Sequence, residues 1–318
     1  MPVTCVGRAA LAVAVRHARA AFKERVVGCY AIGSLAHGGF SALTSDVDVA
    51  LVLRGPLAAS DAAAVAALNA AVLADSTPLV DRTSVFWGSA ASILHRQSPL
   101  DCDGGAALQG RLGPVDKLDW WLNGELVFGE DIRQDEGFRG AFRAPTKPEL
   151  VLASASFAAD KFGASFEFSA LRGGHPHLAL AGDAHRFSKT VLLPLRLLWT
   201  ARTGEVGAVE DAAEWFAGSG VCACGAQRAL VRAAVSVKHY GFNGPGGSLL
   251  LLPDDAQGAG AHAGTVLTPH QLVRLVDSAL LPLYRACLEE YAQFLEMAGE
   301  RRLALTFQTW LARIDASG

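Results

Sequence analysis

The sequence predicts an α/β domain with a mixed sheet, followed by a domain built of α-helices. As far as Trp87, strand-forming segments alternate with a helical segment and glycine-bearing turns. From Pro148 onward, apolar residues recur at helical spacing instead. The chain has 318 residues, whereas a single hydrophobic core rarely grows beyond about 250–300 residues. We therefore expect two domains, residues 1–140 and 141–318, with the boundary between Arg133 and Pro148.

The composition favours a compact protein and disfavours several kinds of partner. Hydrophobic residues make up 51% of the sequence and charged residues 19%, which is enough apolar material for a sizeable core. The net charge is −3, whereas proteins that bind long nucleic acids normally carry a basic excess. The apolar runs Ala9–Val15 and Leu249–Leu252 are too short to cross a membrane, and no signal-peptide cleavage site follows the first. We expect a cytoplasmic protein without a membrane partner, in which the six cysteines are reduced.

The N-terminal elements are expected in a β-turn-β-α-β order. An amphipathic helix ending near Phe22 precedes the first strand, and Gly33-Ser34 breaks that strand. Ser60 has the residue type of an N-cap for the alanine-rich helix that precedes the third strand. The expected strands are Val26–Ile32, Asp46–Leu53 and Leu79–Trp87, and the expected helix between the last two is Asp61–Ala74.

The C-terminal half predicts long helices and one glycine-rich segment. Gly204 and Gly241 are placed to end two of the helices, and Thr268-Pro269 is a typical N-cap and first turn. Residues 241–267 are rich in glycine and lack periodicity, which predicts a long surface loop. The expected helices are His185–Thr203, Gln227–Tyr240, and one or two helices from Pro269 to the C-terminus.

Asp46 and Asp48 are the residues that most clearly indicate chemistry. On a strand, residues two apart project to the same face, so the two carboxylates lie side by side while Val47 and Val49 face a core. Adjacent carboxylates repel each other unless a cation lies between them. Because Mg²⁺ prefers one or two carboxylates with phosphate oxygens and water, the pair predicts a metal–triphosphate site. The alternative is a solvated turn, which is common for an Asp-x-Asp at a strand end.

Gly33 and Ser34 supply the second half of this predicted site. A turn directly after a strand exposes backbone N–H groups, and glycine lets a phosphate approach closely. The Ser34 hydroxyl is a further donor to a phosphate oxygen. Metal-bound carboxylates beside a phosphate-binding turn are typical of phosphoryl- or nucleotidyl-transfer sites. We expect Gly33 and Ser34 to hold the β- and γ-phosphates of a nucleoside triphosphate.

This segment resembles the signature of the DNA polymerase β-type nucleotidyltransferase superfamily. The resemblance is carried by Gly33-Ser34, Gly38, Gly39 and Ser45-Asp46-Val47-Asp48, followed by the apolar residues Val49–Leu53. Within the superfamily, the sequence is most similar to the aminoglycoside (streptomycin/spectinomycin) adenylyltransferases. A second stretch, Val191–Glu205 followed by Asp211–Trp215, looks like the helical domain of that family. Residues 102–143 and the glycine-rich loop match no part of it that we can name.

The resemblance implies a polymerase β-like nucleotidyltransferase domain and a helical substrate-binding domain, with the active site in the cleft between them. It also implies a third carboxylate on the next strand, as a general base or a metal ligand beside Asp46 and Asp48. Asp81 is the candidate, and Asp75 is the alternative. Ser45 is part of the nucleotide-binding signature.

The resemblance also implies roles for residues of the helical domain. Lys189 and Lys238 correspond to basic residues that reach the triphosphate, although either lysine alone also fits an ordinary surface position. Trp215 and Glu214 match a position at which the family contacts its drug. An aromatic face beside carboxylates suits a cationic sugar, through stacking and charge. The equally weighted alternative is a core tryptophan on a helix whose acidic face is solvated.

The sequence therefore predicts a Mg²⁺-dependent nucleotidyltransferase that moves AMP from ATP to a hydroxyl of a small cationic acceptor, such as an aminoglycoside, and releases pyrophosphate. One rival is a nucleotidyltransferase that modifies proteins; the long helical domain argues for a small acceptor instead. A non-enzymatic binding module is disfavoured because Gly33, Ser34, Asp46 and Asp48 occur together. An enzyme that tails nucleic acids is disfavoured by the near-neutral charge. The acceptor's identity and the oligomeric state stay open.

Overall fold

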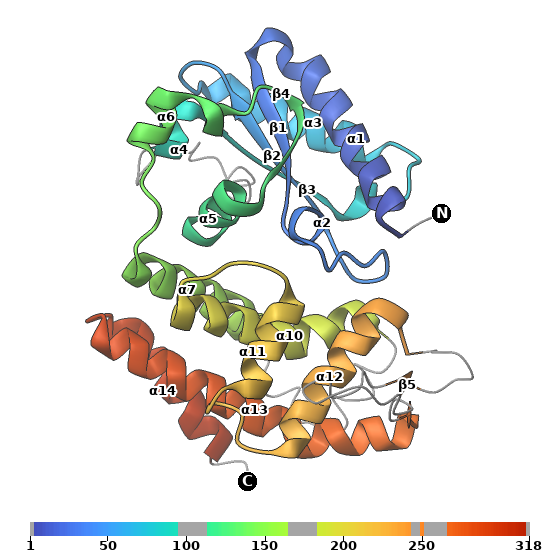
Figure 1. The fold of residues 1–318 in the computed structure, drawn as a ribbon, viewed down its shortest axis with the longest axis vertical. Coiled ribbons are helices and arrows are strands. Elements are labelled where there is room, and N and C mark those ends of the chain that lie inside the picture. The colour runs from blue at the N-terminus through green and yellow to red at the C-terminus, as the bar shows by residue number, and fades with distance from the viewer. Residues whose placement is uncertain (1–2, 95–112, 165–182, 243–248, 251–265, 316–318) are drawn as a thin grey trace. The chain divides into compact units, whose positions relative to one another are not determined.

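The computed structural model describes residues 3–94, 113–164, 183–242, 249–250 and 266–315 (Figure 1). The chain divides into two compact units. Unit 1 comprises Met1–Thr146 and Val206–Ala208, and unit 2 comprises Lys147–Glu205 and Val209–Gly318. Unit 1 contains a mixed sheet with helices, and unit 2 is mainly helical, so the predicted fold class is confirmed.

Unit 1 is a four-stranded sheet between helices. Its elements are α1 (Val3–Phe22), η1 (Lys23–Arg25), β1 (Val26–Ile32), α2 (Ser34–His37), β2 (Val47–Leu53), α3 (Ala59–Leu73), η2 (Val80–Arg82), β3 (Thr83–Ser89), α4 (Ala90–Leu94), α5 (Pro114–Asn123), β4 (Glu125–Gly129), η4 (Ile132–Gln134) and α6 (Glu136–Ala141). The strand order is β3-β2-β1-β4. β1 is antiparallel to both neighbours, whereas β2 and β3 are parallel.

Different helices cover the two faces of the sheet (Figure 1). α1 and α3 pack over one face, where Val47, Val49 and Leu51 of β2 enter a shared core. α4, α5 and α6 belong to the other face, where Tyr30 and Trp120 lie in a smaller core. Successive residues of a strand point to opposite faces. Asp48, which alternates with the two valines, therefore belongs to the face covered by α5.

Strand boundaries differ from the prediction near the candidate site. β2 begins at Val47 rather than Asp46, and β3 begins at Thr83 rather than Leu79. Leu79 has a φ of 70°, which a continuous strand does not allow. The 3₁₀ turn η2 follows, and the chain joins β2 only after it. Asp81, which was expected on a strand, lies in this turn.

The N-terminus of α3 also corrects the prediction, because the helix begins at Ala59 and Ser60 is not its N-cap. Instead, the buried carboxylate of Asp61 accepts the N–H of Ala58 at 2.9 Å. The same carboxylate is bound by Arg25, with N–O distances of 2.5 and 2.9 Å. A carboxylate at the third helical position thus accepts the N–H of the N-cap residue, which is the half of a capping box that does not depend on a serine.

In its described residues, unit 2 consists of helices and a short strand pair. Its elements are α7 (Lys147–Ala164), α10 (Ala184–Thr203), α11 (Val209–Gly218), α12 (Gly225–Tyr240), β5 (Leu249–Leu250), β6 (Val266–Leu267), α13 (Pro269–Met297) and α14 (Arg301–Asp315). Gly204 and Gly241 follow α10 and α12 with φ of 82° and 70°, and Thr268 caps α13, as predicted. The antiparallel pair β5–β6 lies in the segment predicted to be a loop; most of that segment lies outside the described residues.

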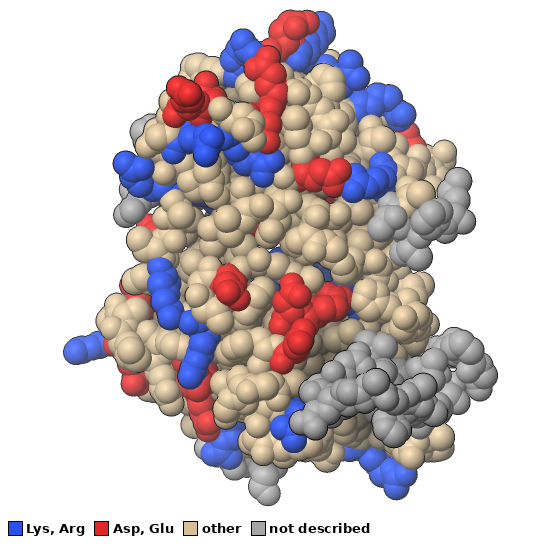
Figure 2. Space-filling model, in the orientation of Figure 1, with Lys and Arg blue, Asp and Glu red and all other residues tan. Residues whose placement is uncertain are grey.

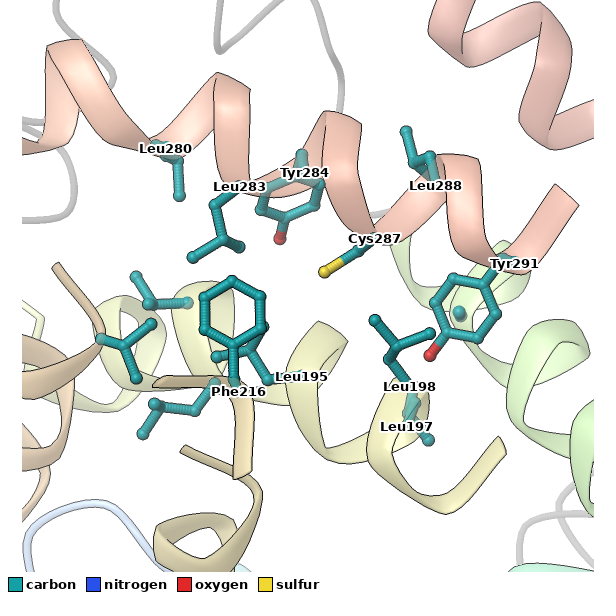
Figure 3. Close-up of a cluster of buried hydrophobic side chains, with 14 of the residues drawn as sticks. Leu195, Leu197, Leu198, Phe216, Leu280, Leu283, Tyr284, Cys287, Leu288 and Tyr291 are labelled. Atoms are coloured by element: carbon teal, nitrogen blue, oxygen red, sulfur yellow. The ribbon is translucent and has the colours of Figure 1, made fainter. Parts of the chain in front are cut away.

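Figure 3 shows part of the core of unit 2, where side chains of α13 such as Tyr284 face Leu195 of α10. In this core, a tyrosine replaces a hydrogen bond that a proline removes from α10. Pro194 lies inside α10 and has no N–H, so the carbonyl of Thr190 lacks its helical donor. The buried hydroxyl of Tyr284, on α13, donates to that carbonyl at 2.7 Å. Tyr291 donates to the carbonyl of Pro194 at 3.3 Å. Among the described helices of either unit, none is long and apolar enough to cross a membrane.

Candidate active site

The turn after β1 is shaped by Gly33. Its φ of 63° and ψ of −150° lie in a region that only glycine occupies without strain. The carbonyl of Gly33 accepts the N–H groups of Ala36 and His37 at 3.0 and 3.1 Å, which closes α2. The first N–H groups of a helix have no acceptor within it. Ser34 therefore presents both an N–H and a hydroxyl at the start of this turn.

Asp48 lies directly beside the turn. It pairs with Ile32, the last residue of β1, across the antiparallel ladder. A Cβ added to Gly33 would lie only 2.8 Å from Oδ2 of Asp48, so the carboxylate occupies the space that a side chain would need. Asp46 and Asp48 are both partly buried and alternate with the buried Val47. This alternation agrees with two carboxylates that project to one side.

The loop that leads to Asp46 is held by hydrogen bonds of its own. Ser45 is buried, and its hydroxyl accepts the N–H of Ser41 at 3.0 Å. The N–H of Ser45 donates to the carbonyl of Ser41 at 2.8 Å. Arg82 donates to the carbonyls of Ala42 and Leu43, which ties η2 to the same loop. Ser45 thus supports the loop that delivers Asp46, and its contact with a nucleotide stays a prediction.

Asp119 on α5, which the sequence analysis missed, contacts the same turn. Its side chain is almost fully buried. Oδ2 of Asp119 accepts the N–H of Gly33 at 3.1 Å and lies 3.9 Å from Nε2 of His37. Asn123, one helical turn further on, donates from Nδ2 to Oδ1 of Asp119 at 2.8 Å. The N–H of Gly33, expected to be exposed for a phosphate, is therefore used inside the protein.

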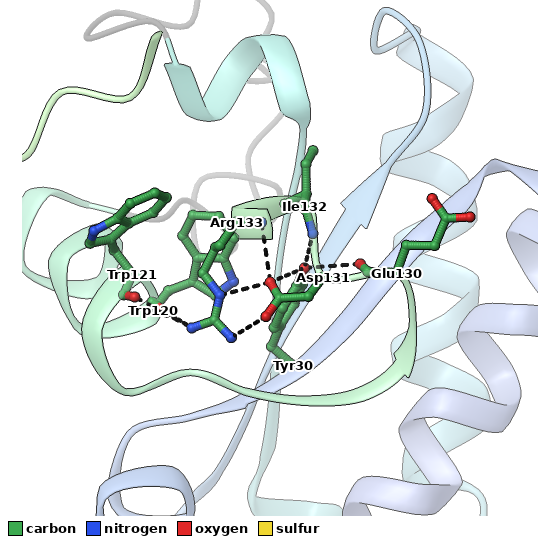
Figure 4. Close-up of polar contacts among 7 residues, drawn as sticks. All are labelled: Tyr30, Trp120, Trp121, Glu130, Asp131, Ile132 and Arg133. Atoms are coloured by element: carbon green, nitrogen blue, oxygen red, sulfur yellow. Dashed lines mark hydrogen bonds and ion pairs between the residues drawn. The ribbon is translucent and has the colours of Figure 1, made fainter. Parts of the chain in front are cut away.

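An aromatic and ionic cluster holds α5 against β1 (Figure 4). Trp120 is fully buried, and its ring meets that of Tyr30 edge-on with centroids 5.5 Å apart. Arg133 donates to the carbonyl of Trp120 at 3.0 Å and makes two bonds to Asp131, at 2.8 and 2.9 Å. Because Asp119 precedes Trp120 in the helix, this cluster also fixes the backbone that carries Asp119.

Asp81 lies in the turn before β3 rather than on the strand itself. It is exposed in η2, and the parallel ladder begins two residues later with Val47 opposite Thr83. Within the described ranges, no three His, Cys, Asp or Glu side chains lie close enough to hold a metal ion. The alternative, Asp75, is bonded to Arg16 and Thr77, both at 2.7 Å, and this gives it a structural role at the end of α3.

The two carboxylates at the start of β2 nevertheless suit a Mg²⁺ ion that binds together with a nucleotide. Mg²⁺ in such sites takes one or two carboxylates, and substrate phosphates and water complete its coordination. Asp46 and Asp48 supply the carboxylates, and Gly33, which lies against Asp48, adds no side chain of its own. A third protein ligand is not required by this chemistry.

The two lysines of unit 2 have different surroundings. Lys189 is exposed on α10, whereas Lys238 on α12 is buried and ion-paired with Glu210 of α11. His239 contacts the same carboxylate at 2.7 Å. Burial disfavours the charged form of Glu210, but the hydrogen bond from His239 and the charge of Lys238 outweigh it and lower its pKa to about 2. Lys238 thus links α11 to α12; nucleotide binding by either lysine stays a prediction.

Trp215 and Glu214 are neighbours on α11 with different exposure. Trp215 is half-buried and packs against the core of unit 2, whereas Glu214 is exposed. On the face drawn in Figure 2, acidic side chains gather in the region of α11. Glu205 and Asp211 are exposed as well, while Glu210 is engaged by Lys238. The structure thus leaves part of the predicted acidic stretch facing solvent beside a partly accessible indole.

Comparison with known proteins bears on the fold. No protein-family model matches the sequence, and no curated protein matches it. The structure resembles that of a spectinomycin adenyltransferase. This enzyme, AAD(9) from Enterococcus faecialis, has a crystal structure with ATP and spectinomycin; the TM-score is 0.50 at 11% sequence identity, and the similarity covers 87% of the present chain and 98% of the other. At this identity the finding shows a shared fold.

The fold shared with the adenyltransferase agrees with the nucleotidyltransferase-like fold that the sequence predicted. Of the predicted residues, the structure brings Gly33, Ser34 and Asp48 together and places Asp46 two residues from Asp48. Asp81 lies in η2, two residues before the ladder of β2 and β3 begins, and its catalytic role stays a prediction. Asp119 was missed because it lies in the stretch for which no resemblance was found. Its one local signal is Asn123, four residues later, at the spacing of a side-chain pair on a helix.

Proposed function

We propose that the protein is a nucleotidyltransferase that transfers AMP from ATP to a hydroxyl of a small cationic acceptor, with an aminoglycoside as the leading candidate. The observation that carries the proposal is the carboxylate of Asp48 packed against the Gly33 turn, with Asp46 two residues before it. Such a pair beside a glycine turn suits a metal–triphosphate complex. The fold shared with a spectinomycin adenyltransferase supports the same class of reaction.

In this proposal each residue of the turn has a defined task. Asp46 and Asp48 hold Mg²⁺, which supplies charge neutralisation at the phosphates when it is bound. Ser34 donates from its N–H and hydroxyl to the terminal phosphates, and Gly33 keeps the space beside Asp48 free of a side chain. The acceptor hydroxyl attacks the α-phosphorus, and pyrophosphate leaves. Asp81 accepts the proton of that hydroxyl.

The acceptor class follows from charge. A polyol that carries ammonium groups is attracted by exposed carboxylates, and an indole face adds stacking. Glu214 and Asp211 are exposed on α11, where Trp215 is partly accessible. The sequence lacks the basic excess that a nucleic-acid acceptor favours. We therefore place acceptor recognition on α11 of unit 2.

The test is incubation with labelled ATP, Mg²⁺ and a panel of aminoglycosides, followed by mass spectrometry of the products. The expected result is an aminoglycoside that has gained one AMP, and pyrophosphate in equal amount. Asp46→Asn and Asp48→Asn should abolish this product while circular dichroism stays unchanged. Glu24→Gln, at an exposed carboxylate of the same unit, is the matched control and should keep wild-type turnover.

Two outcomes would overturn parts of the proposal. Near wild-type turnover of Asp46→Asn or Asp48→Asn removes the metal role from these residues. If no aminoglycoside is modified while a co-expressed protein gains AMP on Ser, Thr or Tyr, the acceptor class is wrong and the protein-modifying rival is correct.

The role of Asp81 is separated from metal binding by a second pair of measurements. Loss of a general base typically slows a reaction by about 10²–10⁴-fold. Asp81→Ala should therefore lower kcat strongly, with the calorimetric affinity for Mg·ATP little changed. Loss of Mg·ATP binding would make Asp81 a metal ligand instead, and unchanged activity would remove it from the site. Asp75→Asn, at the structural alternative, should leave kcat unchanged.

A further inference from the structure

Asp119 contacts both ends of the turn between Gly33 and His37. One carboxylate oxygen accepts the N–H of Gly33 at 3.1 Å and lies 3.9 Å from the ring nitrogen Nε2 of His37. The other oxygen is held by Asn123 at 2.8 Å. The whole arrangement lies in unit 1 and joins residues that are 86 positions apart in the sequence.

The burial of the Asp119 carboxylate calls for a physical explanation. The side chain of Asp119 is 4% exposed, and burying a carboxylate is costly unless hydrogen bonds compensate it. Trp120, the next residue of α5, packs into the smaller core of unit 1, and Leu118 before Asp119 is a buried apolar residue. Unlike these apolar neighbours, Asp119 also accepts hydrogen bonds. One comes from the backbone N–H of Gly33 in the turn, and the other comes from the side-chain amide of Asn123.

Gly33 is the residue of the turn whose backbone conformation most needs to be held in place. Its backbone conformation is open to glycine alone, and glycine is the residue least restrained by its own side chain. The carboxylate of Asp48 lies where a side chain of Gly33 would be, and the N–H of Gly33 is bonded to Asp119. The carbonyl of Gly33 is held within the turn by Ala36 and His37, whereas its N–H is held by Asp119. Loss of the Asp119 contact would therefore release the N–H side of Gly33, next to Ser34.

We propose that Asp119 is a positioning residue that fixes the Gly33–Ser34 turn for the triphosphate, an inference that rests on the proposed nucleotidyl transfer. Asp119 does not touch the nucleotide in this arrangement. It takes up the N–H of Gly33, so that the first donors free for a phosphate are those of Ser34. Asn123 acts one step further away, by holding the carboxylate of Asp119 in line with the turn.

The experiment compares the wild type with four variants by calorimetric titration with Mg·ATP and by steady-state kinetics. Loss of a partner that orients a ligand-binding group typically weakens binding by about 10–100-fold. Asp119→Ala should show a loss in this range in the dissociation constant and KM for Mg·ATP, with the acceptor KM unchanged. Asp119→Asn keeps an oxygen for the N–H of Gly33 and should restore most of the affinity. Asn123→Ala should lie between them.

Leu118→Ala is the matched control, because it truncates a buried residue of the same helix whose side chain has no acceptor for the N–H of Gly33. A merely structural role for Asp119 predicts equal effects of Leu118→Ala and Asp119→Ala on Mg·ATP affinity, and this result would overturn the inference. Amide hydrogen exchange in the nucleotide-free protein gives a direct readout: the Gly33 N–H should lose protection in Asp119→Ala and keep it in Leu118→Ala.

The measurements distinguish a failure of the proposed nucleotidyl transfer from a failure of the role given to Asp119. If the wild-type protein does not bind Mg·ATP, the proposed function fails and the role of Asp119 fails with it. If the wild type binds Mg·ATP and Asp119→Ala binds it equally well, the inference on Asp119 alone is overturned. Unchanged exchange at Gly33 in Asp119→Ala would contradict it as well, whatever the affinity.

Discussion

At the scale of single residues, Gly33 has two independent reasons to be glycine. Its backbone conformation is one reason, and the Asp48 oxygen that fills the place of a Cβ is the other. Gly55 shares the first reason, with a φ of 78°, but a Cβ there would meet no atom within 4 Å. The two glycines therefore allow backbone strain to be separated from the displacement of a carboxylate.

We predict that Gly33→Ala and Gly55→Ala both lower the free energy of unfolding, since strained backbone conformations cost about 1–3 kcal/mol each. Only Gly33→Ala should also lose Mg·ATP binding, because its methyl group would push Asp48 aside. Urea unfolding measures the first effect and calorimetry the second. Equal Mg·ATP affinity in both variants would argue against a role of the Gly33–Asp48 contact in binding.

Glu214 is the residue at which the proposed acceptor charge can be tested without disturbing the core, because its side chain is exposed. Glu214→Gln should raise the acceptor KM and leave the ATP KM unchanged. The attraction is screened by salt, so the difference from wild type should shrink as ionic strength rises. Glu300→Gln, an exposed site on the same unit, should have no effect. An unchanged acceptor KM in Glu214→Gln would place acceptor recognition elsewhere.

At the scale of elements, α3 shows how a charged pair sets a helix start. The pKa of Asp61 is lowered chiefly by its hydrogen bond with Arg25, against the opposing effect of burial. A lowered carboxyl pKa stabilises the fold above the ordinary value of 3.8. That contribution is lost as pH falls through the lower folded-state pKa, because the carboxylate is then protonated in the folded protein as well and no longer pairs as an anion with Arg25.

We predict that Asp61→Asn lowers the free energy of unfolding by about 1.5–3 kcal/mol near neutral pH, the range for hydrogen bonds to charged groups. The difference from wild type should become smaller below the ordinary carboxyl pKa of 3.8. Urea unfolding at neutral and acidic pH measures both. For comparison, Glu125→Gln breaks the exposed pair with Arg8, and exposed pairs contribute only about 0–1 kcal/mol. A pH-independent loss in Asp61→Asn would contradict the ionic explanation.

The α10–α13 contact leads to a second prediction at this scale. Tyr284→Phe removes the hydroxyl that satisfies the carbonyl of Thr190, and an unsatisfied buried polar group costs about 1–3 kcal/mol. Thermal or urea unfolding should show a loss in this range. Pro194→Ala in the same background restores a helical N–H for Thr190, so it should recover part of the stability. If Pro194→Ala gives no recovery, the hydrogen-bond explanation fails.

At the scale of the whole molecule, each unit has its own core and its own buried thiol. Cys29 lies in the core of unit 1, where burial raises its pKa to about 12, and Cys287 lies in the core of unit 2, where burial raises its pKa further. Cys5 and Cys224 are exposed. The thiolate is the reactive form, so accessible thiols react and buried ones do not.

We predict that a thiol reagent labels Cys5 and Cys224 in the native protein and labels Cys29 and Cys287 only after unfolding. Peptide mapping after pulses of reagent at increasing urea then reports the unfolding of unit 1 through Cys29 and that of unit 2 through Cys287. Rapid labelling of either buried thiol without urea would contradict the core that surrounds it.

By itself, the sequence determined the features that depend on neighbouring residues. The alternation of Asp46, Val47, Asp48 and Val49 reports which face of β2 is buried, since the side-chain period of a strand is a property of the backbone. Gly204 and Gly241 marked helix ends for the same reason, because a positive φ is a local requirement. These features led to the fold class and to the Gly33–Asp48 part of the candidate site.

Only the tertiary structure decided which distant residues meet. Asp119 reaches Gly33 across 86 positions, and Arg25 reaches Asp61 across 36. Neither contact follows from spacing along the chain, because it depends on how α5 and α3 pack against the sheet. Asp81 is a case in which local sequence was misleading. The residues around it are typical of a strand, but Leu79 has a positive φ, and the ladder with β2 begins only at Thr83. Local periodicity fixes the direction of a side chain, whereas its partner is chosen by packing over the whole unit.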